Sequence, residues 1–315
     1  MIRTSLKIAT RQSDLALWQT RYVARQLQTY FPQLSIEWVP IITEGDRLLD
    51  QRLDKIGGKG LFVKELESLL LSKEVDLAVH SLKDLPAHLP SELIIGAVCE
   101  RASPLDVLIT SDKRSWAELP INAIVGTSSL RRSIQLRALR PDIRIKPLRG
   151  NVPTRVKKLL NQEFDAIILA QAGLDRLQLD VPWIPFTTEE MLPAIGQGII
   201  GIECRKDDLF LLECLQKIHH IPTSICMNAE RALNAALNGS CQVPLAAYAQ
   251  LQTDRLYLQA RIRCLNGQTY LSAAGQQSFN QAEDLGQAVA QLLLKQGAGD
   301  IIESIRTQGF LFKDE

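Results

Sequence analysis

Short apolar segments alternate with amphipathic stretches through the first two thirds of the chain. The apolar segments predict strands at residues 6–9, 35–42, 75–80, 93–98, 106–110, 123–126, 143–147 and 166–170. The amphipathic stretches predict helices at residues 13–30, 61–72, 130–139 and 153–160. This alternation is typical of doubly wound sheets with largely parallel strands. Because the strands are too many for one compact unit, we predict two α/β domains that meet near residues 99–105.

The last third of the chain has a different pattern. A helix is predicted at residues 223–238, with Thr223 or Ser224 as its cap and Gly239 just past its end. Strands predicted at residues 245–251, 255–264 and 270–276 follow one another through short turns, and a helix predicted at residues 281–295 comes after them. Consecutive strands joined by short turns indicate an antiparallel sheet. We therefore predict a separate α+β domain with a small antiparallel sheet.

The composition is that of an ordinary globular protein. The chain has 315 residues, of which 46% are hydrophobic and 23% charged. No apolar run approaches the ~20 residues that span a membrane. Polar residues interrupt the first residues too early for a secretory signal. We expect a cytoplasmic protein that does not associate with membranes.

The cysteines and histidines show no metal-binding pattern. The six cysteines lack any CxxC spacing, so neither a disulfide framework nor a zinc site is expected; they are Cys99, Cys204, Cys214, Cys226, Cys241 and Cys264. We expect five of them to be buried as small apolar residues, with Cys241 as the exception. His219 and His220 precede Ile221 and Pro222 in a segment that resembles a linker.

Positive charge is concentrated in one segment, although the net charge of the chain is only +1. Residues 131–158 contain seven arginines and three lysines against a single acid, Asp142. A run of charge is usually a solvated face. Arginine, however, is the better donor for carboxylate or phosphate groups, so this segment predicts a bound anion.

Three junctions between a predicted strand and a predicted helix have the same character. Residues 10–13, 126–132 and 148–155 each place hydroxyls or glycine at a helix start, with an arginine within one turn. Helix starts at the carboxyl ends of strands favour anions. One such junction is most simply an ordinary helix cap, but three together predict a ligand with several negative groups. Residues 131–160 contain no aromatic residue to stack on bases, which favours a small polycarboxylate or polyphosphate over nucleic acid.

Two glycine-rich segments do not predict nucleotide binding. Residues 196–201 match the letters of a dinucleotide motif, but a predicted strand follows them where the motif needs a helix. Residues 57–60 resemble a phosphate loop, but no serine or threonine follows Lys59.

Six segments of the chain resemble signatures of the porphobilinogen deaminase (hydroxymethylbilane synthase) family. They are residues 59–67, 78–86, 126–132, 149–155, 196–205 and 239–244, and they occur in family order over most of the chain. The chain departs from the family pattern at four places: Ile195 replaces a proline, Leu82 a frequent methionine and Gly239-Ser240 a double glycine, and an arginine often seen before Asp106 is missing. None of these departures removes a residue with an expected chemical role.

The resemblance implies a three-domain fold. The first two domains are expected to resemble the lobes of periplasmic binding proteins, with the chain crossing between them twice. Domain 1 would comprise residues 1–99 and 198–217, domain 2 residues 105–193, and domain 3 residues 222–315. The resemblance also implies a monomer.

The resemblance further implies a transferase of heme and tetrapyrrole biosynthesis. A dipyrromethane cofactor would be attached covalently to Cys241 by a thioether. Four porphobilinogen molecules would be added to it head to tail, each with loss of ammonia, and water would release hydroxymethylbilane. Cys241 follows a glycine in a predicted helix-to-strand turn, where a thiol can meet an electrophile. Asp84 follows a predicted strand, and its carboxylate could stabilise the positive charge created when ammonia leaves.

The same resemblance assigns roles to the site residues. Asp84 would be catalytic and would also contact the cofactor. The other residues expected to hold the cofactor, besides Cys241, are Lys83, Thr127, Ser129, Arg131 and Arg132. Those expected to meet the substrate are Arg11, Ser13, Arg149, Arg155 and Arg176. No metal is expected.

A different class of function is compatible with two α/β lobes around an anion. A two-lobed protein that binds a small polycarboxylate without catalysis would need no reactive cysteine. Such proteins are usually exported, and no export signal is recognised here. Nucleic-acid binding is the least favoured class.

Overall fold

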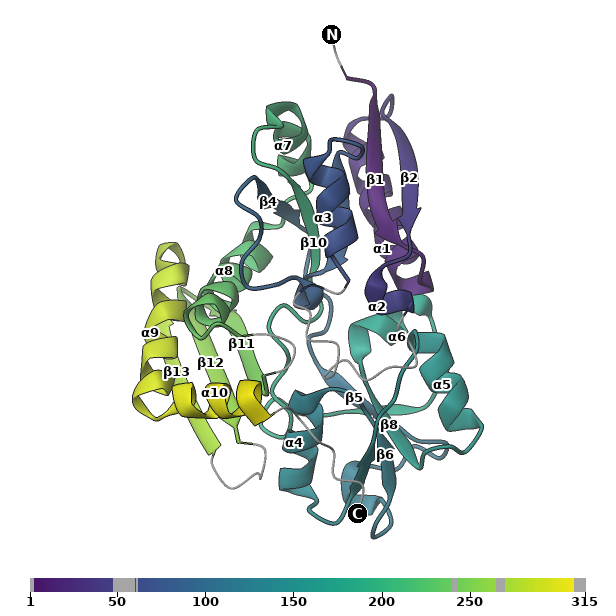
Figure 1. Ribbon diagram of the computed structural model, residues 1–315, viewed down its shortest axis with the longest axis vertical. Helices are drawn as coiled ribbons and strands as arrows, with labels where there is room; N and C mark the ends of the chain where they lie inside the picture. Colours follow the sequence, from purple (N-terminus) through teal and green to yellow (C-terminus); the bar gives the residue numbers. More distant parts are fainter. Residues whose placement is uncertain (1–2, 48–59, 61, 240–242, 265–269, 309–315) are drawn as a thin grey trace.

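A computed structural model of the chain describes residues 3–47, 60, 62–239, 243–264 and 270–308. Three sheets with their helices account for this part of the protein. Figure 1 shows the first sheet in the upper part of the molecule, the second at the lower right and the third at the left. The α/β fold class with an additional C-terminal α+β part is therefore confirmed. The predicted domain limits stay a prediction.

The first sheet has five strands in the order β2-β1-β3-β10-β4. Its strands are β1 (Ser5–Arg11), β2 (Ser35–Ile41), β3 (Leu77–Ser81), β4 (Leu93–Val98) and β10 (Ile200–Arg205). Its helical elements are α1 (Asp14–Tyr30), α2 (Glu44–Arg47), α3 (Lys64–Leu71), the 3-10 turn η1 (Leu82–Asp84) and α7 (Leu209–Gln216). Apolar side chains of α1 and α7 pack on one face of the sheet, and those of α3 pack on the other. Burial on both faces explains why the central strands are continuous apolar runs.

The second sheet has five strands in the order β7-β6-β8-β5-β9. Its strands are β5 (Asp106–Ile109), β6 (Ile124–Gly126), β7 (Arg144–Lys146), β8 (Ala166–Ala170) and β9 (Trp183–Pro185). Its helical elements are η2 (Trp116–Glu118), α4 (Leu130–Leu139), α5 (Val152–Leu160) and α6 (Gln171–Leu177). Leu136 of α4 belongs to one core cluster, and Val156 and Leu174 of α5 and α6 belong to another. The sheet is therefore also covered by helices on both faces.

One strand in each of these sheets runs against the other four. In the first sheet it is β10, which pairs antiparallel with β3 and β4. In the second sheet it is β5, which pairs antiparallel with β8 and β9. The sheets are therefore mixed, and the prediction of largely parallel strands applies to the remaining four of each. In both sheets the reversed strand is the first one formed after the chain arrives from the other sheet.

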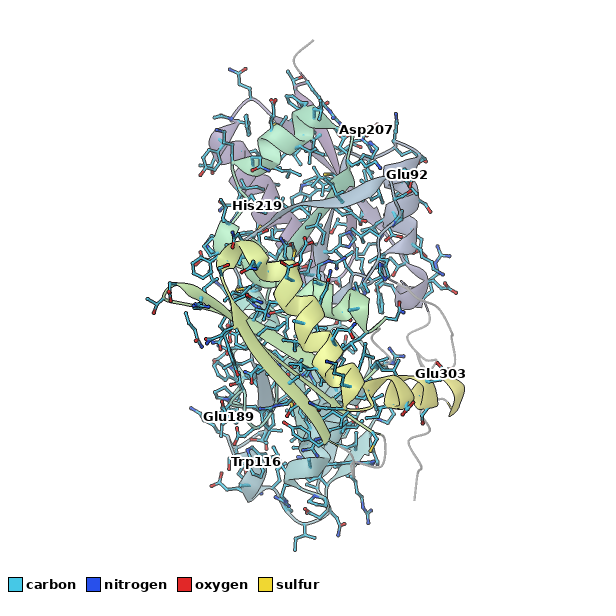
Figure 2. All side chains as sticks on the ribbon, turned by 90° about the vertical axis from the view of Figure 1, so that its left-hand side faces the viewer. Glu92, Trp116, Glu189, Asp207, His219 and Glu303 are labelled. Atoms are coloured by element: carbon cyan, nitrogen blue, oxygen red, sulfur yellow. The ribbon has the colours of Figure 1, made fainter. Side chains whose placement is uncertain are left out.

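The third sheet is antiparallel, in the order β11-β12-β13, as the short turns predict. Its elements are α8 (Ile221–Ala236), β11 (Leu245–Gln252), β12 (Arg255–Arg263), β13 (Tyr270–Gln277), the 3-10 turn η3 (Phe279–Gln281), α9 (Ala282–Lys295) and α10 (Ala298–Gln308). Helix α9 lies across the sheet in Figure 2. Helices α8 and α9 approach closely at Gly286, where an added Cβ would lie 2.3 Å from the carbonyl oxygen of Ala229. Glycine is therefore required at this contact.

Some sequence expectations for individual elements are wrong. The linker expected at residues 219–222 is instead the start of α8, and the cap is His220 rather than Thr223 or Ser224. The His220 ring accepts a hydrogen bond from the backbone N–H of Thr223, and Pro222 fits the first turn because it needs no donor there. The elements α6, β9, α7 and α10 were not expected. The turn η1, which directly follows β3, carries Lys83 and Asp84.

Candidate active site

Four of the expected site residues line one cavity. They are Lys83 after β3, Arg132 in α4, Arg155 in α5 and Arg176 in α6. The remaining walls come from Ser81 at the end of β3, from apolar side chains, from Gly173 of α6 and from glycines of the segment before β10. No acidic side chain is among the described residues that line this cavity. The cavity therefore concentrates positive charge at the carboxyl ends of strands, where open α/β sheets bind their ligands.

Lys83 is strongly affected by its surroundings. Its ammonium donates to Oε1 of Gln197 at 3.3 Å. Burial of the charge, assisted by repulsion from Arg132, lowers the pKa of Lys83 to about 8. Attraction to Asp84 and Asp106 acts in the opposite direction without compensating. A bound carboxylate would stabilise the charged form that burial disfavours.

Arg155 is in a comparable state. Its Nε donates to the carbonyl oxygen of Gly150 at 2.6 Å, which fixes the side chain over the start of its own helix. Burial and repulsion from Arg132, then Arg149, lower the pKa of Arg155 to about 10. Arg155 therefore lies close to other cations, as the sequence clustering of arginines suggests.

Asp84 lies in η1, directly after Lys83. Its charge raises the pKa of both Lys83 and Arg155, which places the carboxylate within electrostatic range of both cavity cations. The turn is held by Leu82, whose N–H donates to the Ile199 carbonyl at 3.0 Å and whose side chain is buried. Gly196 has a positive φ of 69°, and an added Cβ would meet Leu82 at 2.9 Å. The glycine segment before β10 thus supports the turn that presents Asp84.

Arg131 and Arg132 share a buried counter-ion that the sequence reading did not identify. Arg131 Nη1 lies 2.6 Å from one Asp106 oxygen, and Arg132 Nε lies 2.8 Å from the other. Gln197 donates to the same carboxylate at 3.1 Å. Burial alone would raise the pKa of Asp106, but the two arginines outweigh burial and hold the pKa well below its usual range. The carboxylate thus neutralises Arg131 while Arg132 also faces the cavity.

The three expected hydroxyl residues take part in local structure. Ser13 is the N-cap of α1 and accepts from the Ala16 N–H. Ser129 is the N-cap of α4 and accepts from the Arg132 N–H, and Thr127 accepts from the Ser129 N–H. Their contact with a ligand stays a prediction.

Arg11 and Arg149 lie at the margin of the cationic group. Both lower the pKa of Arg155, so both are within electrostatic range of it. Arg11 forms an ion pair with Asp46 of α2, and its guanidinium carbon lies 4.2 Å from the centre of the Phe62 ring. Asp46 is therefore a counter-ion that the sequence analysis did not foresee.

Cys241 lies outside the described residues. On either side of it, α8 ends at Ala236 and β11 begins at Leu245, as expected for a helix-to-strand turn. The N–H of Ala247 in β11 donates to the Pro193 carbonyl at 3.1 Å, which ties this part of the third sheet to the glycine segment of the site. Of the other five cysteines, four are buried as expected, whereas Cys264 is half-exposed.

A second network missed by sequence reasoning joins the site to the third sheet. Arg101 pairs with buried Glu230 of α8 at 2.6 Å and donates to the Gln197 carbonyl at 2.9 Å. Glu230 also accepts from the N–H groups of Gly196 and Ala249. The only sequence signal was the glutamine between Gly196 and Gly198, which was considered only as part of a glycine motif.

None of the described helices is long and apolar enough to cross a membrane. Among the residues that the structure describes, no group of three or more His, Cys, Asp or Glu side chains could hold a metal ion.

Some solved structures are similar to part of the chain at low sequence identity. The BvgS VFT2 domain of Bordetella pertussis is 16% identical, with a TM-score of 0.42, over 68% of this chain and 86% of that one. The alkanesulfonate-binding protein SsuA of Xanthomonas axonopodis pv. citri is 16% identical, with a TM-score of 0.36, over 73% and 74% of the two chains. The BenM effector binding domain with its effector benzoate is 10% identical, with a TM-score of 0.43, over 69% and 91%. These values are too low to indicate a shared function.

Two family models match the chain over most of its length. Residues 6–213 match "Porphobilinogen deaminase, dipyromethane cofactor binding domain", and residues 224–295 match "Porphobilinogen deaminase, C-terminal domain". The first match spans the whole cationic cavity, and the second spans most of the third sheet and its helices. The matches also decide between the two functions considered from the sequence, in favour of the transferase over a binding protein without catalysis. The chain belongs to the porphobilinogen deaminase family, transferases of porphyrin biosynthesis that polymerise porphobilinogen on a dipyrromethane cofactor.

Proposed function

We propose that the cationic cavity holds the carboxylates of the cofactor and of the growing chain, and that the protein is a hydroxymethylbilane synthase. Four porphobilinogen molecules would be joined head to tail, each losing ammonia, and water would release the linear product. One observation carries this proposal: Lys83, Arg132, Arg155 and Arg176 line a cavity that contains no acidic side chain among its described residues.

The donor set fits a group with several carboxylates. The pyrrole rings of porphobilinogen and of the cofactor carry acetate and propionate groups, and each needs a cation or strong donor when it leaves water. Lys83 has a pKa of about 8 and is therefore still mostly protonated at neutral pH, and an arriving carboxylate would stabilise that charge. When bound, the cofactor supplies the terminal pyrrole to which the first substrate molecule is joined. Lys83 and Arg132 would hold that group, with support from Thr127, Ser129 and Arg131.

Asp84 is the proposed catalytic residue. It lies next to Lys83 in a turn braced by Leu82. A carboxylate there can accept a hydrogen bond from a pyrrole N–H. It can also stabilise the positive charge that develops on the substrate as ammonia leaves, an electrostatic effect that works best in a site shielded from water.

Cys241 is the proposed attachment point, and the remaining cations are the proposed substrate contacts. The cysteine would carry the cofactor by a thioether. Arg149, Arg155 and Arg176, with Arg11 and Ser13, would bind the carboxylates of the incoming porphobilinogen. We further propose that the protein is cytoplasmic and acts as a monomer.

The attachment is tested by intact mass. The purified protein should be heavier than its sequence by one dipyrromethane, and Cys241→Ala should remove this increment. Cys264→Ala, at the half-exposed cysteine, is the matched control and should retain it. An increment that survives Cys241→Ala, or that peptide mapping places on another cysteine, rules out the proposed attachment.

The catalytic role is tested by Asp84→Asn. The amide keeps the shape and one hydrogen-bond acceptor but not the charge, so turnover of cofactor-loaded protein should fall by a factor on the order of 10² or more. Asp84→Glu keeps the charge and should retain more activity. Asp254→Asn, in an exposed turn of the third sheet, is the control. Near-normal turnover by cofactor-loaded Asp84→Asn would show that Asp84 has only a structural role.

A further inference from the structure

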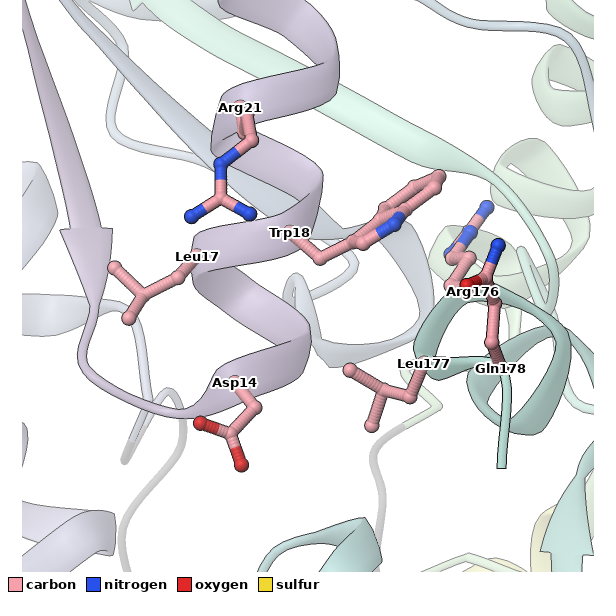
Figure 3. A pocket seen from close by; sticks show the side chains of 7 residues that line it. All are labelled: Asp14, Leu17, Trp18, Arg21, Arg176, Leu177 and Gln178. Atoms are coloured by element: carbon pink, nitrogen blue, oxygen red, sulfur yellow. The ribbon is translucent and has the colours of Figure 1, made fainter. Parts of the chain in front are cut away.

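A second pocket opens on the outside of the protein, between α1 and α6. Figure 3 shows its lining: on α1, Trp18 points toward Arg176 and Gln178 at the end of α6, while Leu17 and Arg21 extend to the other side of the helix in this view and Asp14 lies at its start. Asp14, Arg21 and Gln178 are exposed, whereas the other side chains are half-buried. The pocket is therefore open to solvent at its rim and more enclosed toward Arg176.

Among the described residues, Arg176 is the one side chain that lines both this outer pocket and the cationic cavity. Its Nη2 donates to the Gly198 carbonyl at 2.7 Å, which fixes the guanidinium at the boundary between the two spaces. The guanidinium carbon also lies 5.8 Å from the centre of the Trp18 ring in the outer pocket. A carboxylate bound to Arg176 from outside is thus already next to the inner site.

The outer pocket carries charges of both signs. Arg21 and Arg176 provide two cations and Asp14 provides a carboxylate. Within the part of the chain that the structure describes, neither Asp14 nor Arg21 forms an ion pair or a side-chain hydrogen bond. The guanidinium carbon of Arg21 lies 5.7 Å from the centre of the Trp38 ring. These charges remain available to a ligand.

The middle of the pocket has an aromatic wall. Trp18 stacks on Tyr22 with a centroid distance of 5.4 Å and an interplanar angle of 8°. Stacking on Tyr22 holds the indole in place, and Trp18 is among the side chains that line the pocket. A fixed indole is a good partner for a flat, electron-rich ring such as a pyrrole.

These features match porphobilinogen, which carries two carboxylates, an ammonium group and a planar pyrrole ring. We propose that the pocket between α1 and α6 is an outer docking site for porphobilinogen, which occupies it before entering the cationic cavity. Arg21 and Arg176 bind the carboxylates, Asp14 binds the ammonium group and Trp18 contacts the ring. Arg176 then guides the substrate carboxylate that it binds from the outer pocket into the cationic cavity. This inference rests on the proposed function, because it takes the substrate from there.

The site's main effect is on substrate capture. Exposed ion pairs are weak individually, so a single charge should contribute only a small factor to binding. A charged pocket at the mouth of a cavity also raises the rate of productive encounter, and salt screens this effect. Loss of Arg21 should therefore raise KM roughly 2- to 5-fold while kcat stays unchanged.

The experiment uses cofactor-loaded protein and compares Arg21→Gln with Arg25→Gln. Arg25 is an exposed arginine one turn further along α1 and does not line the pocket. We expect KM for porphobilinogen to rise with Arg21→Gln alone, and the difference between the two variants to shrink at high salt. Equal KM values for the two variants would overturn the docking site. If the unmodified holoenzyme fails to convert porphobilinogen at all, the proposed function fails instead.

The role of Asp14 has a separate test with a substrate analogue. In this analogue a methyl group replaces the aminomethyl group of porphobilinogen, and it is used as a competitive inhibitor. Arg21→Gln should weaken inhibition by the analogue, because the carboxylates are still present. Asp14→Asn should raise KM for porphobilinogen but leave the inhibition constant of the analogue unchanged. An equal effect of Asp14→Asn on both compounds would contradict recognition of the ammonium group.

Discussion

Two groups of cations near the site differ in what neutralises them. Arg131 and Arg132 share the buried carboxylate of Asp106 at 2.6 and 2.8 Å. Lys83 and Arg155 face a cavity whose described walls contain no acid, and burial lowers the pKa of both. Asp106 balances charge in the first group within the protein, whereas the charge of the second group is balanced only when an anion is bound. An internal counter-ion therefore fixes Arg131 and Arg132 in position, with Arg132 still facing the cavity, whereas the cations without one depend on the ligand for their counter-charge.

The largest effect is expected at the internal counter-ion. Asp106→Asn leaves two buried guanidinium groups without their carboxylate, and breaking a buried ion pair typically costs about 3–5 kcal/mol. Urea unfolding of the apoprotein should show a loss of this size. Asp112→Asn, which removes an exposed partner of Arg114, should leave the unfolding curve unchanged. Equal curves for both variants would show that Asp106 does not stabilise the fold.

Arg155 is expected to contribute to activity but not to the stability of the apoprotein. Arg155→Gln removes a cation that has no acid beside it in the cavity, so the apoprotein should be as stable as the parent or slightly more stable. Activity should nevertheless fall by a factor on the order of 10², because a charged contact to substrate is lost. Unfolding curves and turnover of cofactor-loaded protein give the two readouts. Destabilisation of the apoprotein comparable to that of Asp106→Asn would remove the distinction between the two groups.

The pKa of Lys83 predicts how the apoprotein responds to pH. Between about pH 8 and the ordinary lysine pKa of about 10.4, the folded apoprotein has released this proton while the unfolded chain still holds it. The unfolded state then binds more protons, so the Lys83 contribution to stability rises with pH in that window. The affinity for anions should instead fall as pH rises through this window, because the neutral amine attracts carboxylates poorly.

Cofactor assembly gives the measurement for Lys83. The rate at which apoprotein gains the dipyrromethane mass from porphobilinogen should fall several-fold between pH 7.5 and 9, by roughly tenfold per unit at most. Lys83→Arg keeps its charge throughout this range and should lose the dependence. A parent rate that is flat across this range would show that Lys83 stays charged.

The smallest effect on stability and KM is expected for the ion pair of Arg11 with Asp46, because this counter-ion is present but not fully buried. Asp46 is only half-buried, and Arg11 outweighs burial in lowering the pKa of Asp46. Asp46→Asn should cost less than about 1 kcal/mol of stability. It should also free Arg11 for substrate and lower KM about 2-fold. An increase in KM would indicate that the pair with Asp46 orients Arg11 for binding.

Much of the fold follows from local pattern. The strands β4 and β8 and the helix α4 have the bounds that periodicity predicts, because apolar runs between turn residues are a local signal. The reversed direction of β5 and β10 is not local, since it depends on which sheet the chain joins after crossing. The cap at His220 was missed because histidine is an unusual cap and depends on one ring nitrogen.

The candidate site likewise has parts that local sequence predicts and parts that only the fold shows. Arginines at helix starts are visible in the sequence because both the cap and the charge are local. The pairing of Asp106 with Arg131 spans 25 residues, and that of Arg101 with Glu230 spans 129. Only the fold shows which charges meet and which remain for a ligand. Residue spacing therefore could not predict that Gln197 and Asp46 contact residues of the site.

The strand β10 has a consequence for synthesis of the protein. β4 bonds to the first sheet only through β10, which lies about a hundred residues later in the chain. During synthesis on the ribosome, β4 and the edge of β3 that pairs with β10 therefore stay unpaired until residues 200–205 have emerged. Unpaired edges of this kind can associate with other nascent chains. Ribosome-bound chains that stop before residue 200 should accordingly be the ones that chaperones hold longest.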